Sequence, residues 1–161
     1  AANMTKEFGH FGAVIRAAKS SAEAVEDADI ITTATTSKIP VFDGNLVKAG
    51  AHINAIGSYT PQMQEIDETV VTRASKIFCE SEEVALAEAG DLIIPLNKGL
   101  ISADKITGQM GNLLLGKVKG RETAEEITLF DSVGMAVVDI VTAHAIYNKA
   151  LEAKVGYDFR F

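Results

Sequence analysis

Three short segments of the chain combine small and hydroxyl-bearing residues in a way that suits the binding of a flat ligand. They are Thr33-Ala-Thr-Thr-Ser, Ala55-Ile-Gly-Ser-Tyr-Thr-Pro and Asp131-Ser-Val-Gly. Small side chains let a ligand approach the backbone, while hydroxyl and amide groups supply hydrogen bonds. One such segment alone is ordinary helix-capping chemistry, but three together favour a nucleotide site.

The residues indicate no other kind of reactive site. No carboxylate stands at metal-ligand spacing from a histidine and Cys79 is solitary, so no metal site is predicted. Ser58 and Ser132 lack a nucleophile-elbow motif and a histidine placed to activate them. His52 falls on an expected buried strand, where a hydrogen-bonded core histidine is favoured over a general base.

The glycine-rich turn G-x-G-x-x-G, which holds the pyrophosphate of a dinucleotide at a helix N-terminus, does not occur in the chain. The residues alone therefore predict part of a nucleotide-type domain and name no reaction.

Apolar periodicity predicts strands that alternate with helices, which is typical of an α/β fold with a parallel sheet. Ligands bind such sheets at the carboxyl ends of the strands, where the three segments stand. The segment 29–35 is apolar and β-branched, as expected of a strand buried on both faces. Strands are expected at 13–18, 29–35, 51–57, 76–80 and 126–131. Helices are expected at 1–8, ending at Gly9, at 21–28, 66–74, 82–89, ending at Gly90, at 102–115, and from 132 or 134 to about 153.

Length and composition bound the class of protein. The 161 residues, 47% hydrophobic and 23% charged, suit one folded domain. A formal charge of −7 opposes binding to nucleic acid, and no apolar run approaches the roughly 20 residues of a membrane span. A lone cysteine and no secretory leader predict a reducing, cytoplasmic setting. The start at Ala1 suggests part of a longer protein.

Three longer motifs together resemble the ornithine cyclodeaminase/mu-crystallin family. They are Ala28-Asp-Ile-Ile-Thr-Thr-Ala-Thr-Thr-Ser, Gly50-Ala-His-Ile-Asn-Ala-Ile-Gly-Ser-Tyr-Thr-Pro-Gln-Met-Gln-Glu-Ile-Asp and Ile127-Thr-Leu-Phe-Asp-Ser-Val-Gly-Met-Ala. The resemblance runs from the first residue to the last few and covers the later half of a family member. It implies a Rossmann-like, doubly wound, mostly parallel sheet with flanking helices, whose first βαβ portion lies upstream of Ala1.

The resemblance also implies how the chain divides and assembles. Residues 1–145 would be the C-terminal portion of an NAD(P)-binding Rossmann domain. Residues 146–161 would be a helix end and tail that pack on an N-terminal substrate and dimerisation domain, which implies a homodimer. The phosphate-binding glycines and the arginine and lysine that bind the substrate would lie upstream.

Carried over position by position, the resemblance assigns residues of all three segments to the binding of NAD or NADP. The segment after the first motif strand would lie beside the nucleotide, the second near the nicotinamide, and the third would complete the pocket. The cofactor-binding residues would be Thr33, Ala34, Thr35, Ala55, Ile56, Gly57, Ser58, Ser132, Val133 and Gly134.

Tyr59 departs from the cyclodeaminase pattern, in which an aspartate stands two residues after the motif glycine. A tyrosine, with an ordinary pKa of about 10, is a poor base at neutral pH but can donate a proton. The motif Gly57-Ser-Tyr-Thr-Pro is similar to that of family members that reduce cyclic imino acids, such as pyrroline-2-carboxylate. Tyr59 is therefore the candidate catalytic residue.

Three functions remain open on this resemblance. The first is NAD(P)H-dependent reduction of a cyclic imino acid by the full-length protein, with the present chain inactive by itself. The second is an ornithine cyclodeaminase that converts ornithine to proline and ammonia with bound NAD. The third is a mu-crystallin-like protein that binds NADPH without turnover.

Overall fold

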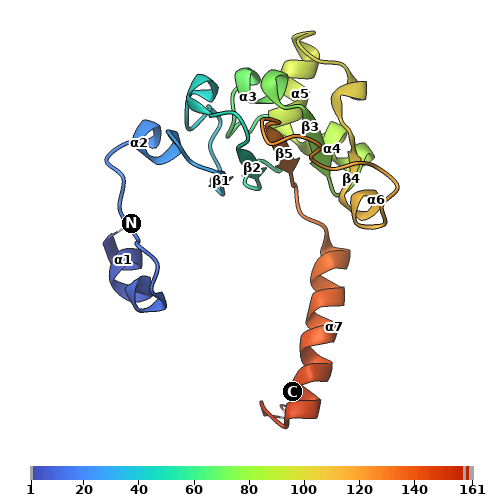
Figure 1. Ribbon diagram of the computed structural model, residues 1–161. Coiled ribbons are helices and arrows are strands. Elements are labelled where there is room, and N and C mark those ends of the chain that lie inside the picture. The colour runs from blue at the N-terminus through green and yellow to red at the C-terminus, as the bar shows by residue number, and fades with distance from the viewer. Residues whose placement is uncertain (1, 158, 160–161) are drawn as a thin grey trace.

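A computed structural model describes residues 2–157 and 159, and shows a five-stranded, wholly parallel sheet in the order β1-β2-β5-β3-β4 (Figure 1). The strands are Ile30–Thr33 (β1), His52–Ala55 (β2), Lys76–Cys79 (β3), Gly108–Gln109 (β4) and Thr128–Asp131 (β5). Helices flank this sheet, so the predicted α/β class is confirmed. The last strand enters the middle of the sheet, between β2 and β3.

Side chains cap three of the helices from the position just before the first helical residue. Ser20, Asp67 and Ser81 each accept a hydrogen bond from the backbone N–H three residues later, which satisfies a donor that the helix leaves free. The helices are Ala2–Phe8 (α1), Ser21–Val25 (α2), Glu68–Arg73 (α3), Glu82–Glu88 (α4), Gly90–Asn97 (α5), Met110–Leu114 (α6) and Ala136–Ala153 (α7). Short 3-10 turns occupy Gly9–Phe11 (η1), Gly44–Leu46 (η2) and Ala103–Lys105 (η3).

One face of the sheet carries the hydrophobic core. Alternate residues of the strands pack there with α3 and α5, and the fully buried members include Ile53, Val71, Ile77, Leu92 and Leu129. The opposite face is open at β1, where Ile30 is 67% exposed. The expectation that 29–35 is buried on both faces is therefore wrong, because no described element covers the second face at this edge.

Residues 13–18, expected to form a strand, lie outside the sheet. Val14 in this segment is 89% exposed. A strand needs backbone partners on a neighbouring strand, and the described part of the chain offers none here. The expected strand at 13–18 is therefore wrong, because the sequence pattern does not show whether a neighbouring strand is present.

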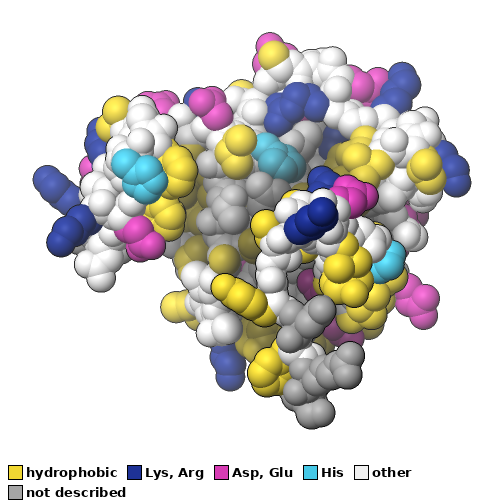
Figure 2. Space-filling view, turned by 90° about the horizontal axis from the view of Figure 1, so that it is seen from below, with side chains coloured by type: hydrophobic (Ala, Val, Ile, Leu, Met, Phe, Trp, Pro, Cys, Tyr) yellow, Lys and Arg dark blue, Asp and Glu magenta, His cyan; other side chains and the backbone are white. Residues whose placement is uncertain are grey.

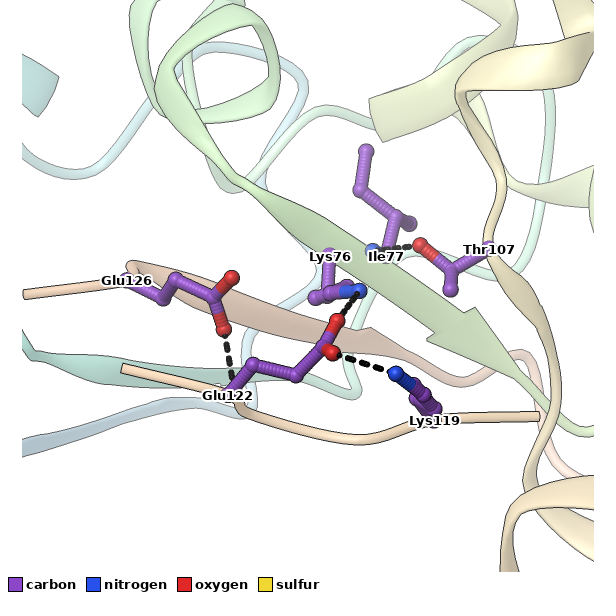
Figure 3. Close-up of polar contacts among 6 residues, drawn as sticks. All are labelled: Lys76, Ile77, Thr107, Lys119, Glu122 and Glu126. Carbon is purple, nitrogen blue, oxygen red and sulfur yellow. Dashed lines mark hydrogen bonds and ion pairs between the residues drawn. The ribbon is translucent and has the colours of Figure 1, made fainter. Parts of the chain in front are cut away.

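The segment 102–115, expected to be one helix, is divided into η3, β4 and α6. Pairing with β3 causes the break, since Thr107 donates its N–H to Ile77 O at 2.7 Å. Ile77 in turn donates its N–H to the Thr107 hydroxyl at 3.0 Å (Figure 3). These bonds draw the chain into the sheet for two residues before α6 begins.

Gly90 begins a helix instead of ending one. It is the first residue of α5, which the sequence pattern missed because Pro95, a residue that disfavours helix interiors, lies within it. A Cβ at Gly90 would come closer than 3.0 Å to the carbonyl oxygens of Met63 and Thr60, so the absence of a side chain permits the close approach. At the other predicted cap, Gly9 continues into η1, and the left-handed residue is Gly12, with φ 77°.

Helix α7 projects away from the body of the molecule (Figure 1). It begins at Ala136, slightly later than expected, and residues 136–149 are all exposed, so it does not pack across the sheet. Hydrophobic side chains gather on the face of the molecule seen from below (Figure 2). The exposed apolar side chains of α7 include Val141 and Ile146. None of the described helices is long and apolar enough to cross a membrane.

A polar network ties the loop before β5 to the first residue of β3 (Figure 3). Glu122 accepts from Lys76 Nζ at 2.8 Å and from Lys119 Nζ at 3.0 Å. Its backbone N–H donates to Glu126 Oε2 at 2.7 Å. The two lysines lower the pKa of Glu122 from 4.5 to about 2. Since Lys76 begins a strand, this network lies at the end of the sheet opposite to the three loops and anchors structure there.

Candidate functional site

The three segments of small and hydroxyl-bearing residues follow adjacent strands. Thr33, Ala55 and Asp131 are the last residues of β1, β2 and β5, and they are paired in register, Thr33 with Ala55 and Ala55 with Asp131. Because the strands are parallel, the loops that follow them meet at one edge of the sheet. The prediction that these segments lie together is confirmed.

Backbone hydrogen bonds join the three loops to one another. Ile56 donates its N–H to Thr33 O at 3.1 Å, and Ser132 donates its N–H to Ala55 O at 2.9 Å. The sheet ladder thus continues for one residue past the ends of the strands. The loops form one continuous surface, named here the carboxyl-end loops: residues 33–35, 55–59 and 132–134.

Glu65 is a fully buried carboxylate that links two of these loops. Its Oε2 accepts from the Thr33 hydroxyl at 2.8 Å and from the Gly57 N–H at 2.7 Å. Its Oε1 accepts from the Thr35 N–H. The sequence interpretation did not assign this residue a role, since an isolated glutamate ordinarily indicates a solvated position.

Asp91, in the first turn of α5, holds the segment that carries Glu65. Its Oδ1 accepts from the backbone N–H of Glu65 at 2.7 Å and of Ile66 at 3.0 Å. Burial raises the pKa of Asp91 from 3.8 to about 6, opposed by these two N–H bonds and assisted by the negative charge of Glu65. Asp91 therefore holds Glu65 in place, and Glu65 in turn holds the loops.

The third loop has a carboxylate of its own. The Ser132 hydroxyl donates to Glu80 Oε1, and Gly134 donates its N–H to Ser132 Oγ at 3.3 Å. A polar run such as Glu80-Ser-Glu-Glu is typical of a solvated helix start. That holds for Ser81, which caps α4, but Glu80 reaches back to the loop after β5.

Asp131 ends the central strand with an unsatisfied carboxyl group. Its side chain is buried, and neither oxygen has a hydrogen-bond partner among the described residues. Burial, followed by the charges of Asp91, Glu80 and Glu65, raises its pKa well above 3.8. The neutral acid is therefore favoured at this position, because an unpaired buried carboxylate is costly.

The predicted cofactor residues differ in how far they are exposed. Thr33, Ala55 and Ser58 are buried, and the Ser58 hydroxyl donates to Met63 O at 3.1 Å, so any ligand contact there is through backbone atoms. Val133 and Ser132 are half-buried. The members exposed on the surface are Ala34, Thr35, Ile56 and Gly134, with Gly57 half-buried between the loops. Tyr59 is 50% exposed beside them.

Two other residues considered for chemistry have structural partners. His52 is half-buried, with Nδ1 2.7 Å from Thr128 Oγ1 and Nε2 3.1 Å from Asn54 Oδ1, at the opposite end of β2 from the loops. The expectation of a hydrogen-bonded histidine is confirmed. Cys79 is buried, and burial with the nearby acids Glu82 and Asp131 raises its pKa to about 12, which keeps the thiol protonated.

The donor set of the carboxyl-end loops fits the nicotinamide half of a dinucleotide and not its pyrophosphate. The N–H groups of Thr35, Ile56, Gly57 and Ser132 are already bonded within the protein, and the loops contain no lysine or arginine. What they offer is a small-residue, partly apolar surface above buried acids, which suits a flat ring of neutral or positive charge. Among residues 2–157 and 159, no cluster of three or more metal-ligating side chains occurs.

The family model described as "Ornithine cyclodeaminase/mu-crystallin family" matches residues 1–154. The chain belongs to this family. The resemblance noted in the sequence is confirmed, and the fold of this family member is Rossmann-like.

A curated relative supports the assignment to a branch of the family. The chain is 44% identical over 151 residues to a Delta(1)-pyrroline-2-carboxylate reductase of Bacillus cereus, covering 94% of the chain and 46% of the relative. The chain thus spans about half the length of the curated relatives that it matches.

Two solved structures superpose closely on this chain. The Thermococcus litoralis Delta(1)-pyrroline-2-carboxylate reductase in complex with NADH and L-proline matches with a TM-score of 0.91 at 38% identity, over 99% of this chain and 49% of that one. An archaeal alanine dehydrogenase dimer with bound NAD matches with a TM-score of 0.85 at 32% identity, over 100% of this chain and 49% of that one.

Proposed function

We propose that the whole protein reduces a cyclic imino acid of the pyrroline-2-carboxylate type, with NADH or NADPH as the hydride donor. The observation that carries the proposal is Tyr59, which is 50% exposed on the carboxyl-end loops, two residues after Gly57. The family resemblance implies an aspartate at this position in cyclodeaminases. The similarity to two pyrroline-2-carboxylate reductases supports it.

The chemistry needs one hydride and one proton. When bound, the reduced nicotinamide supplies the hydride to the carbon of the C=N bond, and the nitrogen takes up a proton to give the saturated amino acid. The chain contributes the surface of Ile56, Gly57 and residues 132–134, which positions the ring and excludes water from one side. The Tyr59 hydroxyl donates a hydrogen bond or proton to the substrate.

Turnover of the whole protein tests the proposal. The protein is mixed with NADH or NADPH and pyrroline-2-carboxylate, and the loss of absorbance of the reduced cofactor is followed, with proline measured as product. We expect cofactor and proline to change in equal amounts. A Tyr59→Phe variant, which keeps the ring and loses the hydroxyl, should lower kcat about 10-fold to 100-fold with little change in stability.

Two parallel reactions separate the alternatives. Ornithine without added reductant is assayed for ammonia, and pyruvate with ammonia and NADH is assayed for loss of NADH. Release of ammonia and proline from ornithine would identify a cyclodeaminase, and consumption of NADH with pyruvate and ammonia an alanine dehydrogenase. Tight dinucleotide binding with no turnover of any substrate would favour a binding protein.

The 161-residue chain by itself should bind a dinucleotide weakly. It contains no G-x-G-x-x-G turn, and the loop N–H groups of Thr35, Ile56, Gly57 and Ser132 are already bonded. Two hollows of the described surface are lined by other residues, at the end of α7 and beside residues 14–24. We expect a dissociation constant above about 100 micromolar for NADH by calorimetric titration. Binding at low micromolar concentration would mean that the described loops hold more of the cofactor than inferred here.

We infer that the whole protein is a cytoplasmic homodimer, in which residues 146–161 pack on a substrate and dimerisation domain. The exposed apolar side chains of α7, including Ile146 and Leu151, support this packing, since a helix with such a surface is usually covered. Asp158, Arg160 and Phe161 lie outside the described residues. Sedimentation of the whole protein measures the assembly directly.

A further inference from the structure

Glu65 is the buried group that joins the loops 33–35 and 55–59. We propose that Glu65 is a positioning residue for the nicotinamide ring: by holding Thr33, Thr35 and Gly57 on one carboxylate, it sets the spacing of loops 33–35 and 55–59. The inference rests on the proposed function, since it concerns the same cofactor. Glu65 itself lies beneath the surface, so it acts through the loops and not by contact.

The bonding of Glu65 requires a group with acceptors only. Three donors converge on its two oxygens: the Thr33 hydroxyl and Gly57 N–H on Oε2, and the Thr35 N–H on Oε1. No lysine or arginine forms an ion pair with Glu65 among the described residues. A buried carboxylate without a cation persists where hydrogen-bond donors satisfy it. The loops supply those donors.

Close packing makes the spacing sensitive to this group. Gly57 lies so near the other loop that a Cβ would come closer than 3.0 Å to the Thr35 backbone and to the Glu65 carboxyl carbon. The two loops are therefore in contact, with the carboxylate of Glu65 filling the space beneath them. Asp91 fixes the backbone of Glu65 from the other side, at 2.7 Å. A rigid support of this kind suits a site that must hold a reacting ring in one orientation.

A glutamine at position 65 could not accept all three hydrogen bonds, because only one of its two polar atoms is an acceptor. Its oxygen can accept from Thr33 and Gly57, but its NH₂ group then faces the Thr35 N–H, so two donors meet. In the reverse orientation the NH₂ group faces the Gly57 N–H. Either way one backbone N–H, that of Thr35 or that of Gly57, loses its acceptor, while the size of the side chain is unchanged.

The experiment compares two ligands on the whole protein. NADH contains the nicotinamide ring, whereas ADP-ribose keeps the adenosine and pyrophosphate and lacks the ring. We expect Glu65→Gln to weaken NADH binding about tenfold and to leave ADP-ribose binding within about twofold, by calorimetry. Glu88→Gln, an exposed carboxylate on α4, is the matched control and should change neither.

A milder pair of variants guards against failure of Glu65→Gln to fold. Thr33→Val removes one tether with a side chain of the same shape, and Thr33→Ser keeps the hydroxyl. We expect Thr33→Val to lose NADH affinity selectively, by about threefold to tenfold, and Thr33→Ser to restore it.

The outcomes separate this inference from the function on which it rests. Equal losses for NADH and ADP-ribose, or no loss for either, would overturn the positioning role of Glu65. If the wild-type protein binds ADP-ribose and NADH equally well, the ring has no site in these loops and the inference fails. Absence of all dinucleotide binding by the wild-type whole protein would instead contradict the proposed function itself.

Discussion

Replacement of Gly57 by alanine is expected to destabilise the chain by about 3 kcal/mol and to abolish measurable NADH binding by the whole protein. The added Cβ would come closer than 3.0 Å to the backbone N and O of Thr35, which are not free to rotate away as a side chain would be. The loops after β1 and β2 must therefore separate. Urea unfolding measures the first effect and calorimetric titration the second.

Gly111→Ala is the matched control for this substitution. Gly111 lies in α6 with no atom within 4 Å of an added Cβ, so alanine should be neutral or stabilising by up to about 1 kcal/mol. A Gly57→Ala variant as stable as the Gly111→Ala variant would contradict the close approach of the two loops.

Replacement of Asp91 by asparagine is expected to stabilise the chain at pH 7.5 and to have little effect near pH 4. Burial raises the pKa of Asp91 from 3.8 to about 6, so the fold favours its protonated form. The wild-type chain therefore gains this stability below about pH 4 and loses it as the pH rises through about 6. Each pKa unit corresponds to about 1.4 kcal/mol, which gives a cost of about 3 kcal/mol above pH 6.

Asparagine resembles the protonated acid in shape and charge. Its oxygen can keep both N–H bonds from Glu65 and Ile66, while its NH₂ group takes the place of Oδ2, which has no partner among the described residues. The measurement is the free energy of urea unfolding of both chains between pH 4 and 7.5, with the exposed Asp104→Asn as control. A variant less stable than wild type at pH 7.5 would show that the charge of Asp91 is needed.

The sequence predicted those parts of the fold that are set by local pattern. Short, largely apolar segments predicted β1, β2, β3 and β5, although β1 and β2 are fully buried only at alternate residues. Parallel strands in turn place the ends of β1, β2 and β5 at one edge, so the three loops could be assembled without the structure. The strand β4 and the helix α5 were missed, since two residues carry no period and Pro95 obscures a helical one.

The sequence predicted the loops on the surface of the site but not the buried acids that hold them. Small and hydroxyl-bearing residues mark the carboxyl-end loops in the sequence, but Glu65 and Asp91 look like ordinary polar residues there. Glu65 is buried because its partners come from Thr33 and Thr35, about 30 residues earlier. Such a long-range match of one acceptor with several donors leaves no periodic signal. The one local hint is that Glu65 stands beside Ile66, at the start of a buried segment.

We expect the nicotinamide ring of the bound cofactor to lie on the carboxyl-end loops. A crystal structure of the whole protein with bound NADH measures this directly. We predict that the ring contacts Ile56, Gly57 and residues 132–134, with the Tyr59 hydroxyl on the side from which a substrate approaches. Glu65 should remain bonded to the loops 33–35 and 55–59. A ring bound elsewhere, with these loops in contact only with solvent or protein, would contradict the account.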